Sequence, residues 1–140
     1  MKETTEAGEA TCVEIDSDRA IVAARQRGRA MAVQIGFTSG AATLIATAIS
    51  ELARNILQYA GKGEIVLQPL ERSDAEGITI IARDHGPGIA DIRQAMQDGY
   101  STSGRLGLGL PGVRRLVDEF EVVSGNGSGT QVRAVKWRLR

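Results

Sequence analysis

The chain has 140 residues, of which 42% are hydrophobic and only 4% aromatic, and its 17 basic residues balance 17 acidic ones. This length fits one ordinary domain with an aliphatic core, and the balanced charge provides neither a basic field for nucleic acid nor an acidic excess for disorder. The single cysteine excludes an intramolecular disulfide, and no apolar run is long enough to span a membrane. Because the polar N-terminus lacks the apolar core of a signal peptide, we expect a cytoplasmic protein.

Apolar periodicity and clusters of glycine and polar residues divide the chain into predicted elements. In chain order these are a flexible tail at 1–10, a strand at 11–15, a helix from about 18 to 36, a helix at 41–59, strands at 63–70 and 77–83, a short helix opened by Asp91, a helix from about 108 to 120, and strands at 121–124 and 130–139. Helices therefore occur in pairs between antiparallel strands. This order favours an α/β (α+β) fold, a two-layer sandwich with a mixed, mostly antiparallel sheet and helices on one face, and argues against a doubly wound parallel sheet. Residues 11–140 are expected to form a single domain.

The second predicted helix carries the first candidate site residues. Glu51 and Asn55 lie four residues apart, so they share one helix face. A carboxylate can polarise a hydroxyl group or water, and an amide oxygen is a suitable ligand for Mg²⁺. Taken by themselves, the two residues fit a solvated polar pair better than a site.

A second motif follows a predicted strand, at residues 84–89. Asp84 stands at the strand end, with Gly86 and Gly88 close behind it and Ile89 after them. A carboxylate in this place can accept a hydrogen bond from an exocyclic amine such as that of adenine. An ordinary aspartate-containing turn is the simpler alternative.

The third motif is a glycine-rich segment that opens a helix, at residues 104–112. Glycines allow close approach to the backbone, and the free N–H groups at the start of a helix bind phosphate. Gly107, Gly109 and Gly112 match a dinucleotide-binding spacing, but the preceding segment is a polar loop and too few residues follow to complete such a fold. A P-loop is excluded because no Gly-Lys-Ser/Thr is present.

Taken together and in this order, the three motifs resemble the GHKL (Bergerat-fold, HATPase_c) superfamily of ATPases and kinases. The resemblance extends from Cys12 to Arg140 and implies a Bergerat ATP-binding fold with ATP and Mg²⁺ as cofactors. It implies that Asn55 holds Mg²⁺, that Asp84 accepts from the adenine amino group, and that Thr130 supports Asp84. The ATP-binding residues that it implies are Asn55, Asp84, Gly86, Gly88, Ile89, Gly104, Gly107, Leu108, Gly109 and Thr130.

Within that superfamily the chain is most similar to the RsbT-type switch serine/threonine kinases of stressosome partner switching. The similarity is carried by residues 49–56, 98–104, 109–116 and the closing Lys136-Trp137. It implies phosphorylation of STAS-domain proteins and, after release, activation of a PP2C-type phosphatase. The balanced charge and the lack of a spanning apolar run lead us to expect no nucleic acid or membrane partner. It also implies Glu51 as general base, and Arg105 either near the γ-phosphate or in solvent. Arg54 is expected to face a neighbouring element or a partner.

Other functions remain open at this stage. One is an anti-sigma-factor serine kinase, although the lid of those kinases is usually longer than the segment between Gly88 and Gly104 here. The other is a nucleotide-dependent binding switch without catalysis. The catalytic domain of a histidine kinase is disfavoured because the lone His85 lies in the glycine loop. A DNA-handling ATPase of the gyrase type is disfavoured by the neutral charge.

Overall fold

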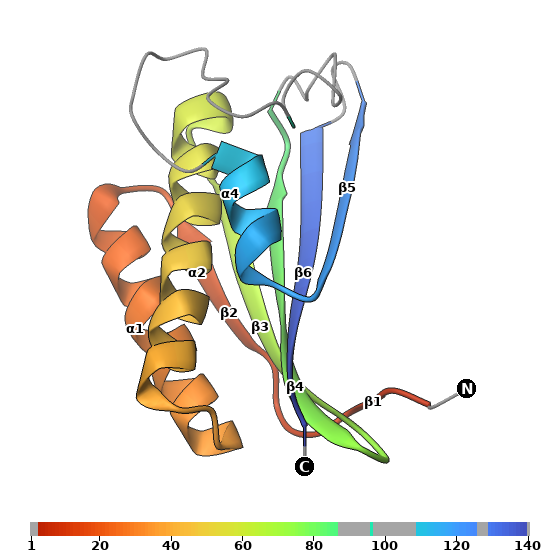
Figure 1. Ribbon diagram of the computed structural model, residues 1–140. Coiled ribbons are helices and arrows are strands. Elements are labelled where there is room, and N and C mark those ends of the chain that lie inside the picture. The colour runs from red at the N-terminus through yellow and green to blue at the C-terminus, as the bar shows by residue number, and fades with distance from the viewer. Residues whose placement is uncertain (1–2, 87–95, 97–108, 126–128, 140) are drawn as a thin grey trace.

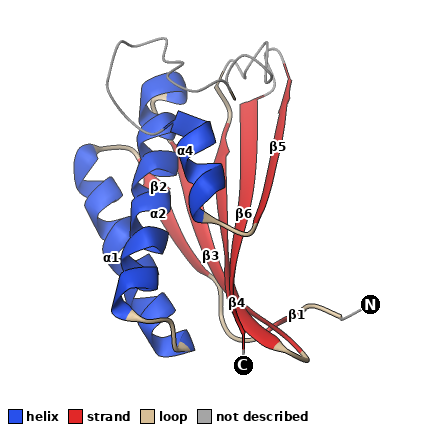
Figure 2. Cartoon of the chain, in the orientation of Figure 1, coloured by secondary structure: helices blue, strands red, loops and turns tan. Residues whose placement is uncertain are grey.

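The structure is a computed structural model that describes residues 3–86, 96, 109–125 and 129–139. Its elements are β1 (Thr5–Glu6), β2 (Thr11–Ile15), α1 (Asp18–Ile35), α2 (Ser39–Ala60), β3 (Gly63–Arg72), β4 (Ala75–Asp84), α4 (Gly109–Leu116), β5 (Glu119–Gly125) and β6 (Gly129–Leu139). The described helices all cover one face of a single sheet (Figure 1, Figure 2). The predicted two-layer α+β sandwich is therefore confirmed. The short helix expected after Asp91 lies outside the described residues.

The described strands form one six-stranded sheet with β4 near its middle. Its order is β1-β3-β4-β6-β5, and β2 also pairs with β3. All described strand pairs are antiparallel, so this part of the chain contains no parallel pair of the kind a mixed sheet would have. β4 is paired along its whole length on both sides, from Ala75 to Asp84. Asp84, at the end of this strand, is thus held by two neighbouring strands.

Local capping fixes the ends of α2. The Thr38 hydroxyl accepts a hydrogen bond from the backbone N–H of Ala41 at 3.2 Å, so the helix begins at Ser39, two residues earlier than predicted. Gly61 ends it in the left-handed conformation with φ of 81°, as predicted. None of the described helices is long and apolar enough to cross a membrane.

The inner face of α2 forms the centre of the core. Ile45, Ile49, Leu52 and Ile56 recur at helical spacing and are at most 2% exposed. Burying each such side chain contributes about 1.5–3 kcal/mol. On the neighbouring α1, a Cβ added to Gly28 would lie only 2.0 Å from Ile49 Cδ1, so this glycine permits the close approach of the two helices. The rotation of α2 about its axis is thereby fixed, and with it the direction of its polar residues.

The N-terminal tail and the β3–β4 turn differ from the prediction. Thr5 and Glu6 pair with the edge of β3, opposite Glu71 and Leu70, so this part of the expected flexible tail is a short strand. The predicted polar turn of six residues shrinks to residues 73–74, because the strands continue pairing as far as Arg72 and Ala75.

The helix predicted to run to residue 120 ends at Leu116. The backbone N–H of Asp118 donates to Val135 O at 2.8 Å, and the Asp118 carboxylate accepts from the backbone N–H of Trp137 at 2.7 Å. Because of these two bonds to β6, the chain leaves the helix before Asp118 and joins the sheet, so β5 begins at Glu119. The apolar periodicity of residues 117–120 was compatible with both a helix and a strand, and contacts with β6 decide the outcome.

Candidate functional site

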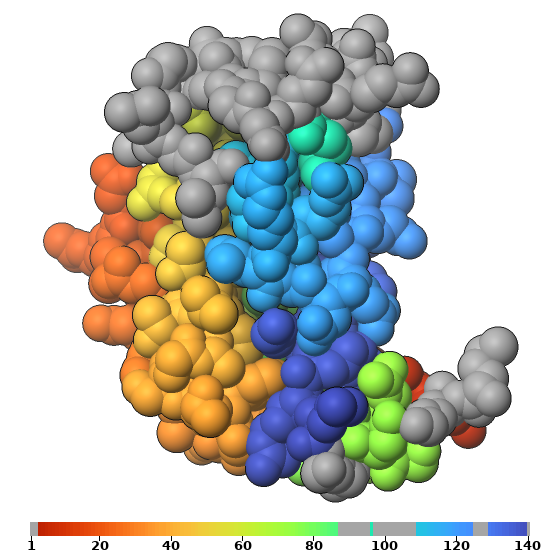
Figure 3. Space-filling model, viewed as in Figure 1, coloured from red at the N-terminus to blue at the C-terminus, as the bar shows by residue number. Residues whose placement is uncertain are grey.

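Glu51 and Asn55 lie on the flank of α2 that faces away from α1. Each residue advances about 100° around a helix, so Glu51 and Asn55 lie roughly 200° and 240° around α2 from Ile49, which meets Gly28 of α1. α4 packs against α2 on the side opposite α1, and the space-filling view shows α2 and α4 in contact (Figure 1, Figure 3). Both site residues are partly buried. The structure therefore presents a carboxylate and an amide together on the flank of α2 that faces away from α1.

The Glu51 carboxylate is held by a residue of its own helix. Arg54 Nη1 donates to Glu51 Oε1 at 2.8 Å, with side-chain exposures of 34% for Arg54 and 15% for Glu51. The sequence led us to expect Arg54 to face a neighbouring element or a partner, whereas the described contact is this i,i+3 ion pair. Spacings of three residues place side chains side by side on a helix, which is the signal that could have identified the pair.

Asp84 ends β4 next to the last turns of α2. Its Oδ1 accepts a hydrogen bond from the backbone N–H of Gly86 at 2.9 Å. A Cβ added to Gly86 would lie 2.6 Å from Ala60 Cβ, so the segment after Asp84 rests directly on the C-terminal turn of α2. A Cβ added to Gly63 would lie 3.1 Å from Asp84 Cβ and 2.8 Å from Ile56 Cγ2. The strand-end aspartate and the C-terminal half of α2 thus meet at one end of the molecule.

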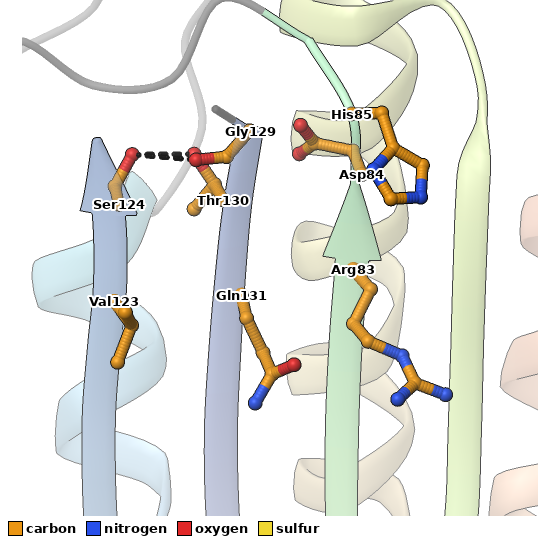
Figure 4. Close-up of a pocket in the computed structure, with 8 residues that line it drawn as sticks. All are labelled: Arg83, Asp84, His85, Val123, Ser124, Gly129, Thr130 and Gln131. Carbon is orange, nitrogen blue, oxygen red and sulfur yellow. Dashed lines mark hydrogen bonds between the residues drawn. The ribbon is translucent and has the colours of Figure 1, made fainter. Parts of the chain in front are cut away.

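Thr130 lies opposite Asp84 in the β4–β6 pairing. Directly paired residues in an antiparallel sheet point to the same face, so the two side chains are neighbours. The Thr130 hydroxyl is hydrogen-bonded to Ser124 of β5 at 2.8 Å, and Ser124 also donates to Gly129 O at 3.1 Å (Figure 4). Ser124 was missed from the sequence because only the strand register places it beside Thr130.

A cavity of about 220 Å³ lies at the ends of β4, β5 and β6. Its lining includes Asp84 and Thr130 and the other residues drawn in Figure 4, and the Asp84 carboxylate is directed toward β6. Neither Glu51 nor Asn55 lines it. The structure therefore brings the predicted residues together as two groups at the same end of the fold.

The remaining predicted residues fall mostly outside the described part of the chain. Gly88, Ile89, Gly104, Arg105, Gly107 and Leu108 all lie there. Gly109 is described and opens α4 with φ of 64°, in the left-handed region that favours glycine.

The described polar groups have the spare hydrogen-bonding capacity that ATP and Mg²⁺ require. Within the described residues, the Asp84 carboxylate has only its bond from Gly86, which leaves Oδ2 able to accept from an amino group. In the same part of the chain, the half-buried amide of Asn55 makes no hydrogen bond, so its oxygen can serve a hard cation. No cluster of three or more histidine, cysteine or acidic residues suited to a metal occurs in the described ranges. Mg²⁺ at a nucleotide site keeps several waters and takes oxygen ligands from the substrate phosphates, so it needs few ligands from the protein.

Comparison with known proteins identifies the family. The model of the histidine kinase-like ATPase domain matches residues 16–136. Serine/threonine-protein kinase RsbT of Bacillus subtilis is 54% identical over 127 residues, which cover 91% of this chain and 96% of RsbT. An anti-sigma F factor of Caldanaerobacter subterraneus is 34% identical over 112 residues, which cover 77% of this chain and 78% of that protein.

A solved structure supports the same fold. The histidine kinase domain of a blue-light activated histidine kinase from Erythrobacter litoralis superposes with a TM-score of 0.54 at 23% identity. The match covers 85% of this chain and 59% of that chain, and at this identity it speaks for the fold alone. With its motifs, fold and relatives in agreement, the chain belongs to the histidine kinase-like ATPase (GHKL) family and, within it, to the family of serine/threonine-protein kinase RsbT.

Proposed function

We propose that the chain is a cytoplasmic, ATP-dependent serine/threonine kinase that phosphorylates STAS-domain proteins in a bacterial partner switch and, once released, activates a PP2C-type phosphatase. The observation that carries the proposal is the arrangement of α2, which presents Glu51 and Asn55 on one flank while its C-terminal turn packs against the segment after Asp84. The 54% identity with RsbT supports the same activity. Residues 11–140 would form a single kinase domain.

Both groups of site residues take part in nucleotide recognition, Asp84 with Thr130 at the strand ends and Asn55 on α2. Asp84 Oδ2 accepts from the adenine amino group, while Oδ1 stays bonded to Gly86 and keeps the carboxylate oriented. Thr130, tied to Ser124, lies beside Asp84 and limits its movement. The Asn55 amide oxygen would hold Mg²⁺, which would supply charge neutralisation for the phosphates. The backbone at Gly86, Gly88, Gly104, Gly107 and Gly109, with Ile89 and Leu108, completes the site.

Phosphoryl transfer needs mainly positioning and a proton acceptor. Glu51 is the general base that receives the proton of the incoming serine or threonine hydroxyl, and the partly buried flank of α2 shields this step from bulk water. Arg105 offsets charge on the transferred group in the transition state. The acceptor hydroxyl comes from the partner protein.

Two substitutions separate binding from transfer. D84N keeps the size of the side chain but loses the charged acceptor, so the Kd for ATP should rise about 10- to 100-fold. E51A should bind ATP normally and lose transfer by about 10²-fold or more. Calorimetric titration of ATP with Mg²⁺, beside phosphorylation of a STAS-domain protein with labelled ATP, measures both effects.

The matched control is D74N. Asp74 lies in the β3–β4 turn, where it pairs with Arg72 at 2.9 Å, and it should tolerate the same chemical change without effect on Kd or transfer. Normal ATP binding by D84N would refute the site assignment. Tight ATP binding by the unaltered protein without phosphorylation of any STAS-domain protein would instead support a binding switch without catalysis.

An anti-sigma-factor serine kinase is a second candidate. The observation that favours it is the 34% identity with an anti-sigma F factor over most of both chains. Purified sigma factors tested for ATP-dependent complex formation with this protein distinguish the two functions. A stable complex that blocks transcription would support the second candidate over the first.

A further inference from the structure

The ion pair on α2 is placed where it can control the reacting carboxylate. Arg54 Nη1 contacts Glu51 Oε1 at 2.8 Å, one helical turn apart. Within the described residues this is the only polar contact of the Glu51 carboxylate, so Oε2 has no competing partner there. One oxygen is thus occupied and the other is available to a hydroxyl group.

The ion pair between Arg54 and Glu51 adds little to the stability of α2. Ion pairs between residues three apart on an accessible helix surface contribute little to folding. α2 is already anchored by Ile45, Ile49, Leu52 and Ile56, which are at most 2% exposed. The pair also differs from an ordinary surface pair because the Glu51 side chain is only 15% exposed, beside the flank that carries Asn55. Its consequence is therefore local: it restricts the rotamers of a glutamate that has three rotatable bonds.

We propose that Arg54 is a positioning residue for phosphoryl transfer, which holds Oε1 of Glu51 so that Oε2 faces the incoming serine or threonine hydroxyl. This inference rests on the proposed kinase function. In the step that it assists, the hydroxyl oxygen forms a bond to the γ-phosphorus of the substrate ATP as the bond from that phosphorus to the departing ADP oxygen breaks. The hydroxyl proton passes to Glu51 Oε2, and ADP leaves with the electron pair.

The guanidinium group suits this role better than an ammonium group. It is planar, stays charged at all relevant pH values and directs its N–H groups in fixed directions, whereas an ammonium group is a compact charge on a flexible stem. A lysine at this position would keep the charge and lose the fixed direction. Such a variant should therefore recover only part of the function of arginine.

The experiment compares R54A and R54K with the unaltered protein in the phosphorylation assay. Because misplacement of a general base is costly, R54A should lower kcat about tenfold or more while the Kd for ATP changes less than about twofold. R54K should recover part of the loss. Methylguanidinium, added at millimolar concentration below its denaturing range, should raise the kcat of R54A and leave that of the unaltered protein unchanged.

R29A is the matched control for loss of an arginine. Arg29 is exposed on α1 and donates to Ser39 Oγ at 3.0 Å, so its replacement removes one charge and one hydrogen bond away from the α2 flank. Its kcat should equal that of the unaltered protein. Thermal unfolding of each variant measures any general loss of stability separately.

The double variant E51A/R54A tests whether Arg54 acts through Glu51. If it does, adding R54A to E51A should lower the residual rate no further. A kcat of R54A equal to that of the unaltered protein, or the same fold loss with and without Glu51, would overturn the inference. Failure of the unaltered protein to phosphorylate any acceptor would instead count against the proposed function, so the two failures are distinguishable.

Discussion

The contact between Gly28 and Ile49 gives a quantitative test of how α1 and α2 pack. A methyl group added by G28A would lie 2.0 Å from Ile49 Cδ1, but 3.5 Å from Ile49 Cγ1 and 3.6 Å from Leu67 Cδ1. Only the first distance is a clash. I49V removes the Cδ1 atom and leaves the rest of the side chain in place, so the second substitution should relieve the strain caused by the first.

The expected free energies follow from these contacts. Overpacking in G28A costs about 1–3 kcal/mol, and alanine in place of glycine in a helix gains about 1 kcal/mol, so the net loss should be about 1 kcal/mol. I49V alone should cost about 1 kcal/mol because it leaves a small cavity. In the double variant the new methyl group occupies that cavity and the helix gain remains. The double variant should therefore be about 1 kcal/mol more stable than the unaltered protein, which is about 3 kcal/mol better than the sum of the single effects.

Urea unfolding measures this coupling. The fluorescence of Trp137, the only tryptophan, reports on β6, and far-ultraviolet circular dichroism reports on the helices. The two signals should give the same midpoint if unfolding is two-state. Additive losses in the double variant would refute the packing of α1 on α2 through this pair.

Two further predictions concern the edges of the fold. The Cys12 thiol donates to the Glu64 carboxylate at 3.1 Å, and this bond, with a smaller effect of burial, raises the pKa of Cys12 above its ordinary value of 9.0. Because a raised folded-state pKa stabilises the protein below the unfolded pKa, this contribution to stability should be lost as the pH rises above about 9. E64Q removes the carboxylate that raises the pKa, so it should increase the rate at which iodoacetamide alkylates Cys12 at pH 8. Arg138 of β6 also holds the end of α1, because its Nε donates to Gly36 O at 2.8 Å while its Nη1 contacts Glu76 at 3.4 Å. R138A should therefore lower the free energy of unfolding in urea by about 1 kcal/mol and speed hydrogen exchange at the end of α1. Unchanged exchange there would contradict the proposed contribution of Arg138.

Features determined by neighbouring residues were predictable from the sequence. α1 and α2 end where expected because Gly36 and Gly61 can adopt the left-handed conformation there. The position of Glu51 and Asn55 on one face follows from helical spacing alone. The order of strands and helices also indicated the two-layer architecture, since each helix pair needs a sheet face to cover.

Features determined by distant residues were not predictable. The helix before β5 ends early because Asp118 bonds to β6, a strand that comes later in the chain. The tail gains a strand because β3 offers a free edge to Thr5 and Glu6. Ser124 reaches Thr130 only through the register of two strands, which periodicity does not define. In each case a tertiary contact outweighs the local preference.

The place of Asp84 on the central strand has a consequence for how variants of this protein are interpreted. Asp84, which we propose binds the adenine, is the last residue of β4, and β4 is paired along its whole length on both sides. Ligand affinity and global stability are therefore linked: a ligand at 100 times its Kd adds about 2.7 kcal/mol to the free energy of unfolding. By the same linkage, an apolar substitution that loosens β4 can mimic a binding defect without touching the nucleotide. A loss of activity identifies a site residue only when the melting temperature without ligand is unchanged.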